Sequence, residues 1–292
     1  MFNLYFAGSQ SRPPEQLIED RKYKRLLSYV NDKRHIEDRR EKQLLTFVDS
    51  GAYSSHTRGI HLDVDEYIQY TNERDPVIEM FAQVDKIPAS SSKQDVEQAA
   101  KQTWENYLYM RERVNSPQKL VPVFHRGEDF KNLLNILDYP EELTFLALGA
   151  LVGVPTKQRE MFIEKSFTLI QKYRPSLKIH GFGMTNLSLL EQFPFYSADS
   201  TSWIMTAING AIMSPFGVVL VSDQKTHEPG HLFNIAPALQ EQVIQYVKSF
   251  GFDVQDLSKE HARRCMLNIE YLANWATNYK YKPKSVKQKR LF

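Results

Sequence analysis

Four short stretches place polar or glycine residues directly after runs of apolar or β-branched residues. These stretches are Val48–Tyr53, Gln83–Asp85, Leu148–Gly153 and Ser197–Ser200. Helix-like segments separate most of them, which predicts an alternation of strands and helices. A (β/α)₈ barrel builds its active site at the carboxyl ends of successive strands. The pattern therefore predicts that Asp49, Asp85 and Asp199 converge on one pocket, although they lie far apart in the sequence.

Eight apolar segments are predicted to be strands, because buried parallel strands read as apolar runs rather than as strict alternation. They are Phe2–Phe6, Leu44–Val48, Val77–Val84, Leu120–Phe124, Thr144–Leu148, Leu177–His180, Phe195–Ala198 and Gly217–Val221. The charged segment Glu15–Arg40 carries a partial apolar stripe of helical spacing, which favours a helix. Further helices are predicted over Gln94–Val114, Asp129–Leu137, Met161–Tyr173 and Leu187–Gln192.

The chain has 292 residues, and a barrel of this type typically needs about 250. We therefore expect an α/β fold with one domain, a (β/α)₈ TIM barrel over about residues 1–235. A C-terminal helical extension and a basic tail would fill about residues 236–292, with helices over Pro237–Phe250 and Ser258–Tyr279.

Composition excludes several classes of protein. The single cysteine, Cys265, excludes an internal disulfide framework and a cysteine-rich zinc site. No secretory leader is recognisable, and no run of about 18 apolar residues could span a membrane. A cytoplasmic location and no membrane partner are therefore expected. The net charge is only +2, so the distribution of charge is more informative than its sum.

Each of the three carboxylates has a chemical and a structural interpretation. Asp199 could attack a sugar C1′ as a nucleophile, or it could cap the helix that follows. Asp49 could exchange a proton with a leaving base, or it could close an Asx turn before Gly51. Asp85 could accept the N1–H and exocyclic amine of a guanine-like base, or it could pair with Lys86 or another nearby cation.

Other strand ends carry residues that could contact a planar ligand. His125 can donate or accept a hydrogen bond, or it could simply face solvent. The remaining candidates are Gly149, Ala150, Leu151, Gly181 and Phe182, which could otherwise be ordinary loop residues. Histidines also pair as His56 with His61 and as His227 with His231. Glycines interrupt both pairs, so no metal site is expected.

A basic tail follows the last predicted helix. Its cations are Lys280, Lys282, Lys284, Lys287, Lys289 and Arg290. Such a run could contact phosphates, with Tyr279 and Tyr281 available to stack on a base. Runs of this kind are also common as solvated faces or disordered ends.

Taken in order, these segments resemble the tRNA-guanine transglycosylase superfamily over about Leu44 to Trp203. Asp49–Tyr53 is similar to the family's Asp-Ser-Gly motif, and Asp85 with Pro88-Ala89 is similar to its third-strand motif. The other matching segments are Val123–Gly127, Gly149–Gly153, Gly181–Gly183 and Ala198–Ser200. The closest resemblance is to the DNA-modifying branch, the DpdA-like 7-deazaguanine DNA transglycosylases of phages and bacteria.

The resemblance implies base exchange through a covalent aspartyl-deoxyribosyl intermediate, with no cofactor. Asp199 would be the nucleophile and Asp49 the acid and base. Base-binding residues would be Asp85, His125, Gly149, Ala150, Leu151, Gly181, Phe182, Ser50 and Tyr53. The implied partners are DNA, a free 7-deazaguanine such as 7-cyano-7-deazaguanine, and other DNA-modification proteins. For a phage-encoded chain the location would be the host cytoplasm.

The departures from the family pattern favour DNA over tRNA. The zinc subdomain of the tRNA enzymes needs several cysteines, and the chain has one. The Arg/Asn-rich stretch that contacts tRNA is replaced by Thr201–Ile204, and His125 stands where the family usually has Gln. A zinc-free tRNA-guanine transglycosylase, a non-catalytic nucleic-acid-binding subunit and a hydrolytic glycosylase remain as alternatives. A hydrolytic glycosylase would release guanine without any added base.

Overall fold

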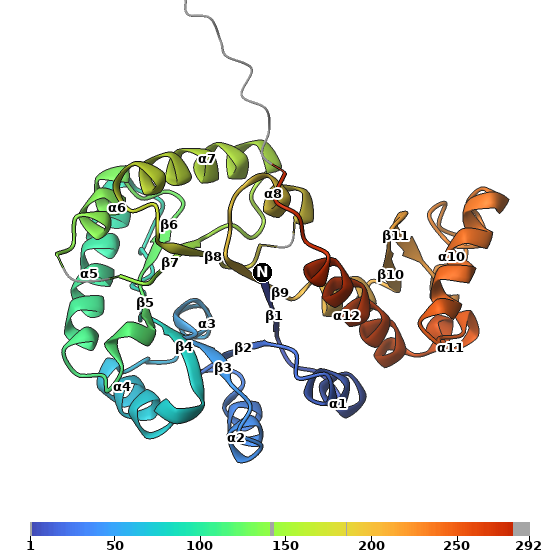
Figure 1. Ribbon diagram of the computed structural model, residues 1–292, viewed down its shortest axis with the longest axis horizontal. Coiled ribbons are helices and arrows are strands. Elements are labelled where there is room, and N and C mark those ends of the chain that lie inside the picture. The colour runs from blue at the N-terminus through green and yellow to red at the C-terminus, as the bar shows by residue number, and fades with distance from the viewer. Residues whose placement is uncertain (1, 141–142, 185, 283–292) are drawn as a thin grey trace, which may run out of the picture.

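Nine parallel strands form a nearly closed, barrel-shaped sheet in the computed structural model, which describes residues 2–140, 143–184 and 186–282 (Figure 1). The strands are β1 (Asn3–Ala7), β2 (Arg25–Ser28), β3 (Thr46–Asp49), β4 (Ile78–Ala82), β5 (Leu120–Val121), β6 (Val123–His125), β7 (Phe145–Gly149), β8 (Lys178–Gly181) and β9 (Ser197–Ser200). Their order is β5-β4-β3-β2-β1-β9-β8-β7-β6. The predicted (β/α)₈ barrel class is confirmed.

The two edge strands of this sheet are halves of one segment. β5 and β6 are separated only by Pro122, which has no N–H to donate to a neighbouring strand. β5 pairs with β4, and β6 pairs with β7. The carbonyl of Pro122 still accepts from the N–H of Ala147 at 2.9 Å, so the barrel closes at this proline.

Helices cover the outside of the barrel. They are α1 (Arg12–Asp20), α2 (Lys33–Glu41), α4 (Val64–Glu73), α5 (Lys93–Arg111), α6 (Phe130–Leu137), α7 (Thr156–Tyr173), α8 (Leu187–Gln192) and α9 (Ser202–Ile208). The short α3 (Ala52–Arg58), which follows β3, is seen instead within the ring of strands in Figure 1. Short 3₁₀ turns lie at Asp75–Val77, Pro117–Lys119 and Asp223–Lys225. Within the described residues, no helix is both long and apolar enough to cross a membrane.

Two apolar layers follow from the alternation of side chains along each strand. One face of the strands packs under the helices, where Phe6, Val48 and Phe124 are buried. The opposite face fills the barrel interior, with side chains from alternate positions of neighbouring strands. This interior cluster consists of Tyr5, Ala7, Leu26, Phe47, Met80, Ala82, Val121, Val123 and Ala147. The interior is therefore packed, and chemistry is confined to its rim.

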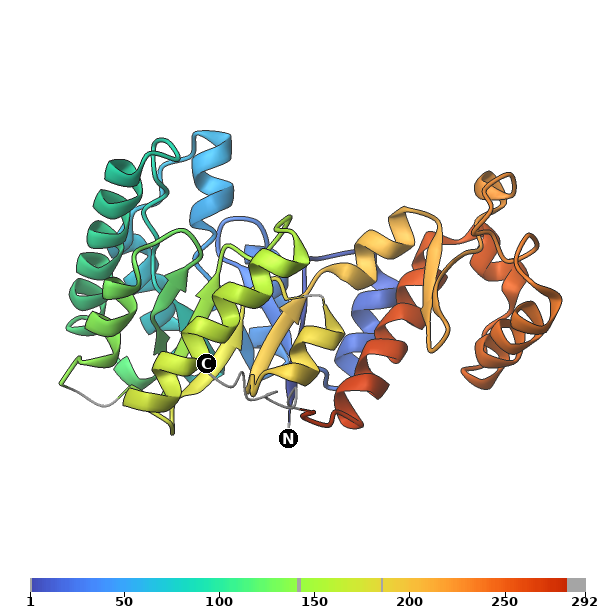
Figure 2. The ribbon, with the colours of Figure 1, turned by 90° about the horizontal axis from the view of Figure 1, so that it is seen from above.

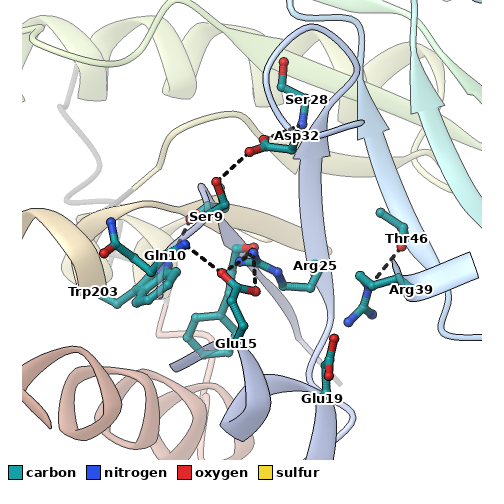
Figure 3. Close-up of polar contacts among 12 residues, drawn as sticks. Ser9, Gln10, Glu15, Glu19, Arg25, Ser28, Asp32, Arg39, Thr46 and Trp203 are labelled. Atoms are coloured by element: carbon teal, nitrogen blue, oxygen red, sulfur yellow. Dashed lines mark hydrogen bonds and ion pairs between the residues drawn. The ribbon is translucent and has the colours of Figure 1, made fainter. Parts of the chain in front are cut away.

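The predicted helix over Glu15–Arg40 is wrong, because this segment contains strand β2 between α1 and α2. β2 has only four residues and begins with the buried Arg25, so it lacks the apolar run expected of a barrel strand. Arg25 donates to both carboxylate oxygens of Glu15 at 2.9 and 3.0 Å (Figure 3). The Glu15 carboxylate of α1 thus compensates the buried charge of Arg25, which the sequence had placed in a helix.

Figure 3 also shows how the first two strand ends are held together. The Ser9 hydroxyl, after β1, donates to Oδ1 of Asp32 at 2.8 Å, and the N–H of Ser28 in β2 donates to Oδ2 at 2.9 Å. Trp203 of α9 donates to the carbonyl of Ala7 at 3.0 Å. These contacts fix the rim next to β9, where Asp199 lies.

The predicted eighth strand, Gly217–Val221, is not part of the barrel. It forms β11 (Gly217–Leu220), which pairs antiparallel with β10 (Ala211–Ser214). This hairpin joins α10 (Pro237–Ser249) and α11 (Val254–Lys259) in a lobe beside the barrel (Figures 1 and 2). The lobe has its own apolar cluster, which includes Ile212, Val243 and Leu257. The barrel segment before the lobe therefore ends near residue 208 rather than 235.

The chain returns to the barrel through α12 (His261–Thr277), which packs against β1, α1 and α9. Arg264 Nε donates to the carbonyl of Ala207 at 3.0 Å, and Asn268 Nδ2 donates to that of Trp203 at 3.2 Å. The predicted helix over Ser258–Tyr279 is thus confirmed from His261 onward. The last helix completes the outer ring of the barrel after the lobe.

Candidate active site

Asp49, Asp85 and Asp199 lie at the carboxyl ends of β3, β4 and β9, at one end of the barrel. They are close enough to interact. Burial, followed by the charges of Asp85 and Asp199, raises the pKa of Asp49 to about 7, although the N–H of Gly51 opposes this rise. A carboxylate with a pKa near 7 can both donate and accept a proton at neutral pH.

Asp49 also makes the local contact that its structural interpretation predicted. Its Oδ2 accepts from the N–H of Gly51 at 3.1 Å, closing the turn into α3. Gly51 has a φ of +76°, and a Cβ there would lie 2.6 Å from Oγ of Ser28. Glycine is therefore required at this position, and the turn holds the Asp49 carboxylate at the rim.

Asp199 does not cap the helix after it, since α9 has no side-chain cap. Instead its Oδ1 accepts from the N–H of Gly183 at 2.8 Å and contacts Nε2 of His180 at 3.3 Å. The residue is only 5% exposed. Within the described residues, no hydrogen bond occupies Oδ2 of Asp199. One carboxylate oxygen is thus anchored, and the other is available to a substrate.

Asp85 pairs with His125 rather than with Lys86. Oδ2 of Asp85 lies 3.0 Å from Nε2 of His125, and Oδ1 accepts from Nε2 of Gln83 at 2.9 Å. Nδ1 of His125 lies 2.8 Å from Oε1 of Glu128. Burial lowers the pKa of His125, but Asp85 and Glu128 together outweigh it and raise the pKa to about 10. His125 is therefore a cation between two carboxylates, not a solvent-facing histidine.

The other predicted base-binding residues divide into a group that borders the same end of the barrel as the three carboxylates and a group whose positions are explained by packing. The first group consists of Gly149, Tyr53, Ala150 and Phe182. Gly149 lies beside His125, and a Cβ at Gly149 would be 2.7 Å from Cδ2 of the histidine ring. Tyr53 is 70% exposed at the rim. Ala150 has a φ of +56°, and Phe182 is partly buried beside His180. These residues border the same end of the barrel.

Ser50 and Leu151 lie differently, because both side chains are buried away from solvent. Leu151 belongs to the outer apolar core, so only its backbone could reach a ligand. Gly181 ends β8, and a Cβ there would lie 3.1 Å from Met184 and Phe195. This close packing is enough to explain why residue 181 is a glycine, so the glycine by itself is no evidence for a bound base.

Sequence reasoning missed His180 and Glu128, and it named Gln83 and Gly183 only as members of the Gln83–Asp85 and Gly181–Gly183 stretches. His180 pairs with Ser197 across β8 and β9, which places it one layer below Asp199 inside the barrel. The sequence signal for His180 was the alternation of side chains along β9, which puts Ser197 and Asp199 on the same face as each other. Glu128 could have been found from its spacing of three residues from His125.

Lys280 and Lys282, the part of the basic tail that the structure describes, lie at the other end of the barrel. Tyr279 stacks on Phe2, which precedes β1, at 4.6 Å between ring centroids. Lys282 pairs with Glu191 of α8 at 3.1 Å. Lys280 and Lys282 are therefore remote from the three carboxylates, and their predicted contact with nucleic acid stays a prediction. Lys284, Lys287, Lys289 and Arg290 lie outside the described residues.

A cavity of about 770 Å³ lies between α5 and α6 rather than at the barrel mouth. Gln83, Trp104 and Glu128 are among its lining residues, so it borders the His125 pairing. Across the described ranges, no three His, Cys, Asp or Glu side chains group as metal ligands would. Comparisons of the chain with models of known protein families and with curated proteins found no match.

Proposed function

We propose that the protein is a DNA-guanine transglycosylase, which exchanges guanine in DNA for a 7-deazaguanine base. The observation that supports this most is that three carboxylates at one end of the barrel each have different surroundings. Asp49 has a pKa of about 7, Asp199 has one anchored and one open oxygen, and Asp85 is held by a histidine cation. Distinct environments allow like residues to take different roles in acid, base and nucleophilic steps.

In the first half-reaction, Oδ2 of Asp199 attacks C1′ of the target deoxyguanosine. The new C1′–O bond forms as the C1′–N9 bond breaks, and its electron pair leaves with guanine. Protonated Asp49 donates a proton to the departing base. The product is an ester between Asp199 and the sugar, with the configuration at C1′ inverted.

In the second half-reaction, the incoming base loses its N9 proton to the Asp49 carboxylate and attacks C1′. The ester C–O bond breaks, and its electron pair returns to Asp199. The second inversion restores the original configuration. Asp49 regains its proton in this step, so the cycle requires a group that titrates near neutrality, which agrees with its pKa of about 7.

Asp85 is the residue proposed to read the base. A free Asp85 oxygen lone pair can accept the N1–H or exocyclic amine of a guanine-like ring. Gln83 and His125 fix the plane of this carboxylate through the contacts at 2.9 and 3.0 Å. A preorganised acceptor costs little to order when the base binds.

Exposed cations near the carboxyl ends of the strands support a nucleic-acid substrate. Lys86 and Arg126 follow β4 and β6, Arg58 ends α3, Lys157 lies in the first turn of α7, and all four are exposed. Their position at the carboxyl ends of the strands lets them meet phosphates beside an extruded nucleotide. The exposed ring of Tyr53 could stack on a base at the same rim.

The test is release of radiolabelled guanine from DNA and from matched tRNA, with and without added 7-cyano-7-deazaguanine. The proposal predicts release from DNA that requires the added base. Asp199→Asn should abolish it, whereas the exposed carboxylate variant Asp138→Asn should not. Both variants remove one charge, so a general charge effect would appear in both.

Each other result assigns a different function. Release from tRNA alone would move the protein to the RNA-modifying branch. Release without added base would indicate a hydrolytic glycosylase. Tight binding of DNA without release would favour a nucleic-acid-binding subunit.

A further inference from the structure

The side chain beneath Asp199 is a fully buried histidine for which the exchange reaction has so far required no role. His180 is 0% exposed and lies in the barrel interior. Its ring makes edge contacts with Tyr5, Phe47 and Phe182, with centroids 5.8, 4.9 and 4.8 Å away. A polar ring in such an apolar site is costly unless its nitrogens find partners.

Both ring nitrogens have partners. Nδ1 lies 2.9 Å from Oγ of Ser197, and Nε2 lies 3.3 Å from Oδ1 of Asp199. An ionised carboxylate can only accept, so Nε2 carries the proton in this contact. The three aromatic rings and Ser197 together leave the imidazole one orientation, in which Nε2–H is aimed at Asp199.

We propose that His180 is a positioning residue that, with Gly183, makes Asp199 a good leaving group in the second half-reaction. This inference rests on the proposed base exchange. His180 and the N–H of Gly183 both meet Oδ1, which leaves Oδ2 to bond to C1′. In the ester, Oδ1 becomes the carbonyl oxygen and keeps both donors.

The two half-reactions respond differently to these donors. When the ester breaks, negative charge returns to the carboxylate, and hydrogen bonds to a charged oxygen are stronger than those to an ester carbonyl. Such a strengthening lowers the barrier of that step. When the ester forms, the same donors stabilise the starting carboxylate and give no comparable help. Loss of the His180 donor should therefore slow ester breakdown more than ester formation.

Two variants separate this role from simple packing. His180→Met removes the donor but keeps an unbranched side chain of similar volume among the aromatic rings. His180→Gln retains an N–H at about the position of Nε2. Thermal unfolding of each variant gives the fraction folded, to which the rates are normalised.

The experiment follows the covalent protein–DNA species on denaturing gels. Enzyme and labelled DNA form the adduct first, and 7-cyano-7-deazaguanine is then added in excess. For His180→Met we expect about a 10-fold slower disappearance of the adduct and a larger adduct fraction before the chase. The rate of adduct formation should change less than about threefold, and His180→Gln should recover most of the chase rate.

The outcomes distinguish this inference from the proposed function. Equal slowing of both steps in His180→Met, or a His180→Gln variant as slow as His180→Met, would overturn the positioning role while base exchange stands. If the adduct of His180→Met disappeared as fast as that of the wild type after the base is added, the positioning role would likewise be overturned. Absence of any adduct and of any exchange in the wild type would overturn the proposed function and this inference together.

Discussion

Two histidine–aspartate pairs lie on different strands at the same end of the barrel, and their surroundings differ. His125 lies between Asp85 and Glu128 and is 25% exposed, and these carboxylates hold its pKa at about 10. His180 is fully buried and meets one carboxylate and one hydroxyl. The first pair is an ion cluster and the second is a hydrogen-bonded pair; in the proposed function, they would hold the base-reading group and the nucleophile, respectively.

If the proposed function holds, the difference teaches that a histidine and an aspartate can serve base recognition in one pair and the covalent reaction in the other. A charged histidine neutralises Asp85 and fixes it in one orientation. A buried histidine that donates to one oxygen of Asp199 leaves the other oxygen reactive. Sequence spacing cannot distinguish these cases, because the partners come from different strands.

The largest expected effect on stability comes from removing the cation of the first pair. In His125→Leu, two partly buried carboxylates would lose their shared partner, and we expect a loss of about 2–4 kcal/mol at pH 7. Urea denaturation followed by circular dichroism would measure it. Glu128→Gln, which keeps the shape and one carboxylate, should cost less.

The pH dependence of this effect has a defined sign. The pKa of His125 in the folded protein, about 10, lies above its usual value of 6.5. Its contribution to stability is therefore full below about pH 6.5 and is lost as the pH rises through about 10. A wild-type advantage over His125→Leu that stays constant from pH 6 to pH 10.5 would contradict the ion-cluster interpretation.

Asp49→Asn should have an effect of opposite sign. The pKa of Asp49, about 7, lies above its usual 3.8, so stability falls as the pH rises from about 3.8 to about 7, and the full cost of the ionised form is present above pH 7. We expect the variant to be more stable than the wild type by about 1–3 kcal/mol at pH 8, with little gain at pH 4. Base exchange should fall sharply. Unfolding curves at the two pH values test this, and an equal gain at both would argue against a raised pKa.

Gly183→Ala tests the second pair through its backbone donor. Gly183 has a φ of +61°, and a Cβ there would lie 2.5 Å from Cγ2 of Val152. We expect a loss of about 1–2 kcal/mol in stability from the strained backbone. Displacement of the N–H from Asp199 should also slow exchange. Gly153→Ala is the control, since it has a φ of +72° and nothing within 4 Å of its Cβ. Equal exchange rates in the two folded variants would remove Gly183 from the account.

The smallest effect is expected at the far end of the barrel. A Lys280→Ala/Lys282→Ala variant should change the Kd for DNA by less than about twofold at 0.15 M salt, because both lysines lie away from the three carboxylates. Arg126→Ala, at the rim, should weaken binding more. Fluorescence anisotropy with a labelled duplex would rank them, and the reverse order would support the predicted contact of Lys280 and Lys282 with nucleic acid.

The fold was largely predictable because most strands are apolar runs that end in polar or glycine residues. β2 was not, since its buried Arg25 depends on Glu15 of α1, a contact that no local pattern reveals. The strand at Gly217–Leu220 was misplaced because an antiparallel hairpin and a barrel strand share the same short apolar pattern.

The site was predictable where position alone decides it. The ends of β3, β4 and β9 must meet at one end of a parallel barrel, which places Asp49, Asp85 and Asp199 together. The pairing of His125 with Glu128 and the place of His180 beneath Asp199 depend on side-chain direction within the barrel. The alternation along β9 puts Ser197 and Asp199 on one face, but the pairing of His180 with Ser197, which brings His180 to Asp199, could not be read from the sequence.

The measurement that tests the central claim most directly is mass spectrometry of the trapped covalent species. The protein would be mixed with guanine-containing DNA without a competing base, denatured and digested. The account predicts a deoxyribosyl adduct on the peptide that contains Asp199, absent from Asp199→Asn and chased away by 7-cyano-7-deazaguanine. Guanine exchange without any adduct, or an adduct on Asp49 or Asp85, would contradict the assignment of Asp199 as the nucleophile.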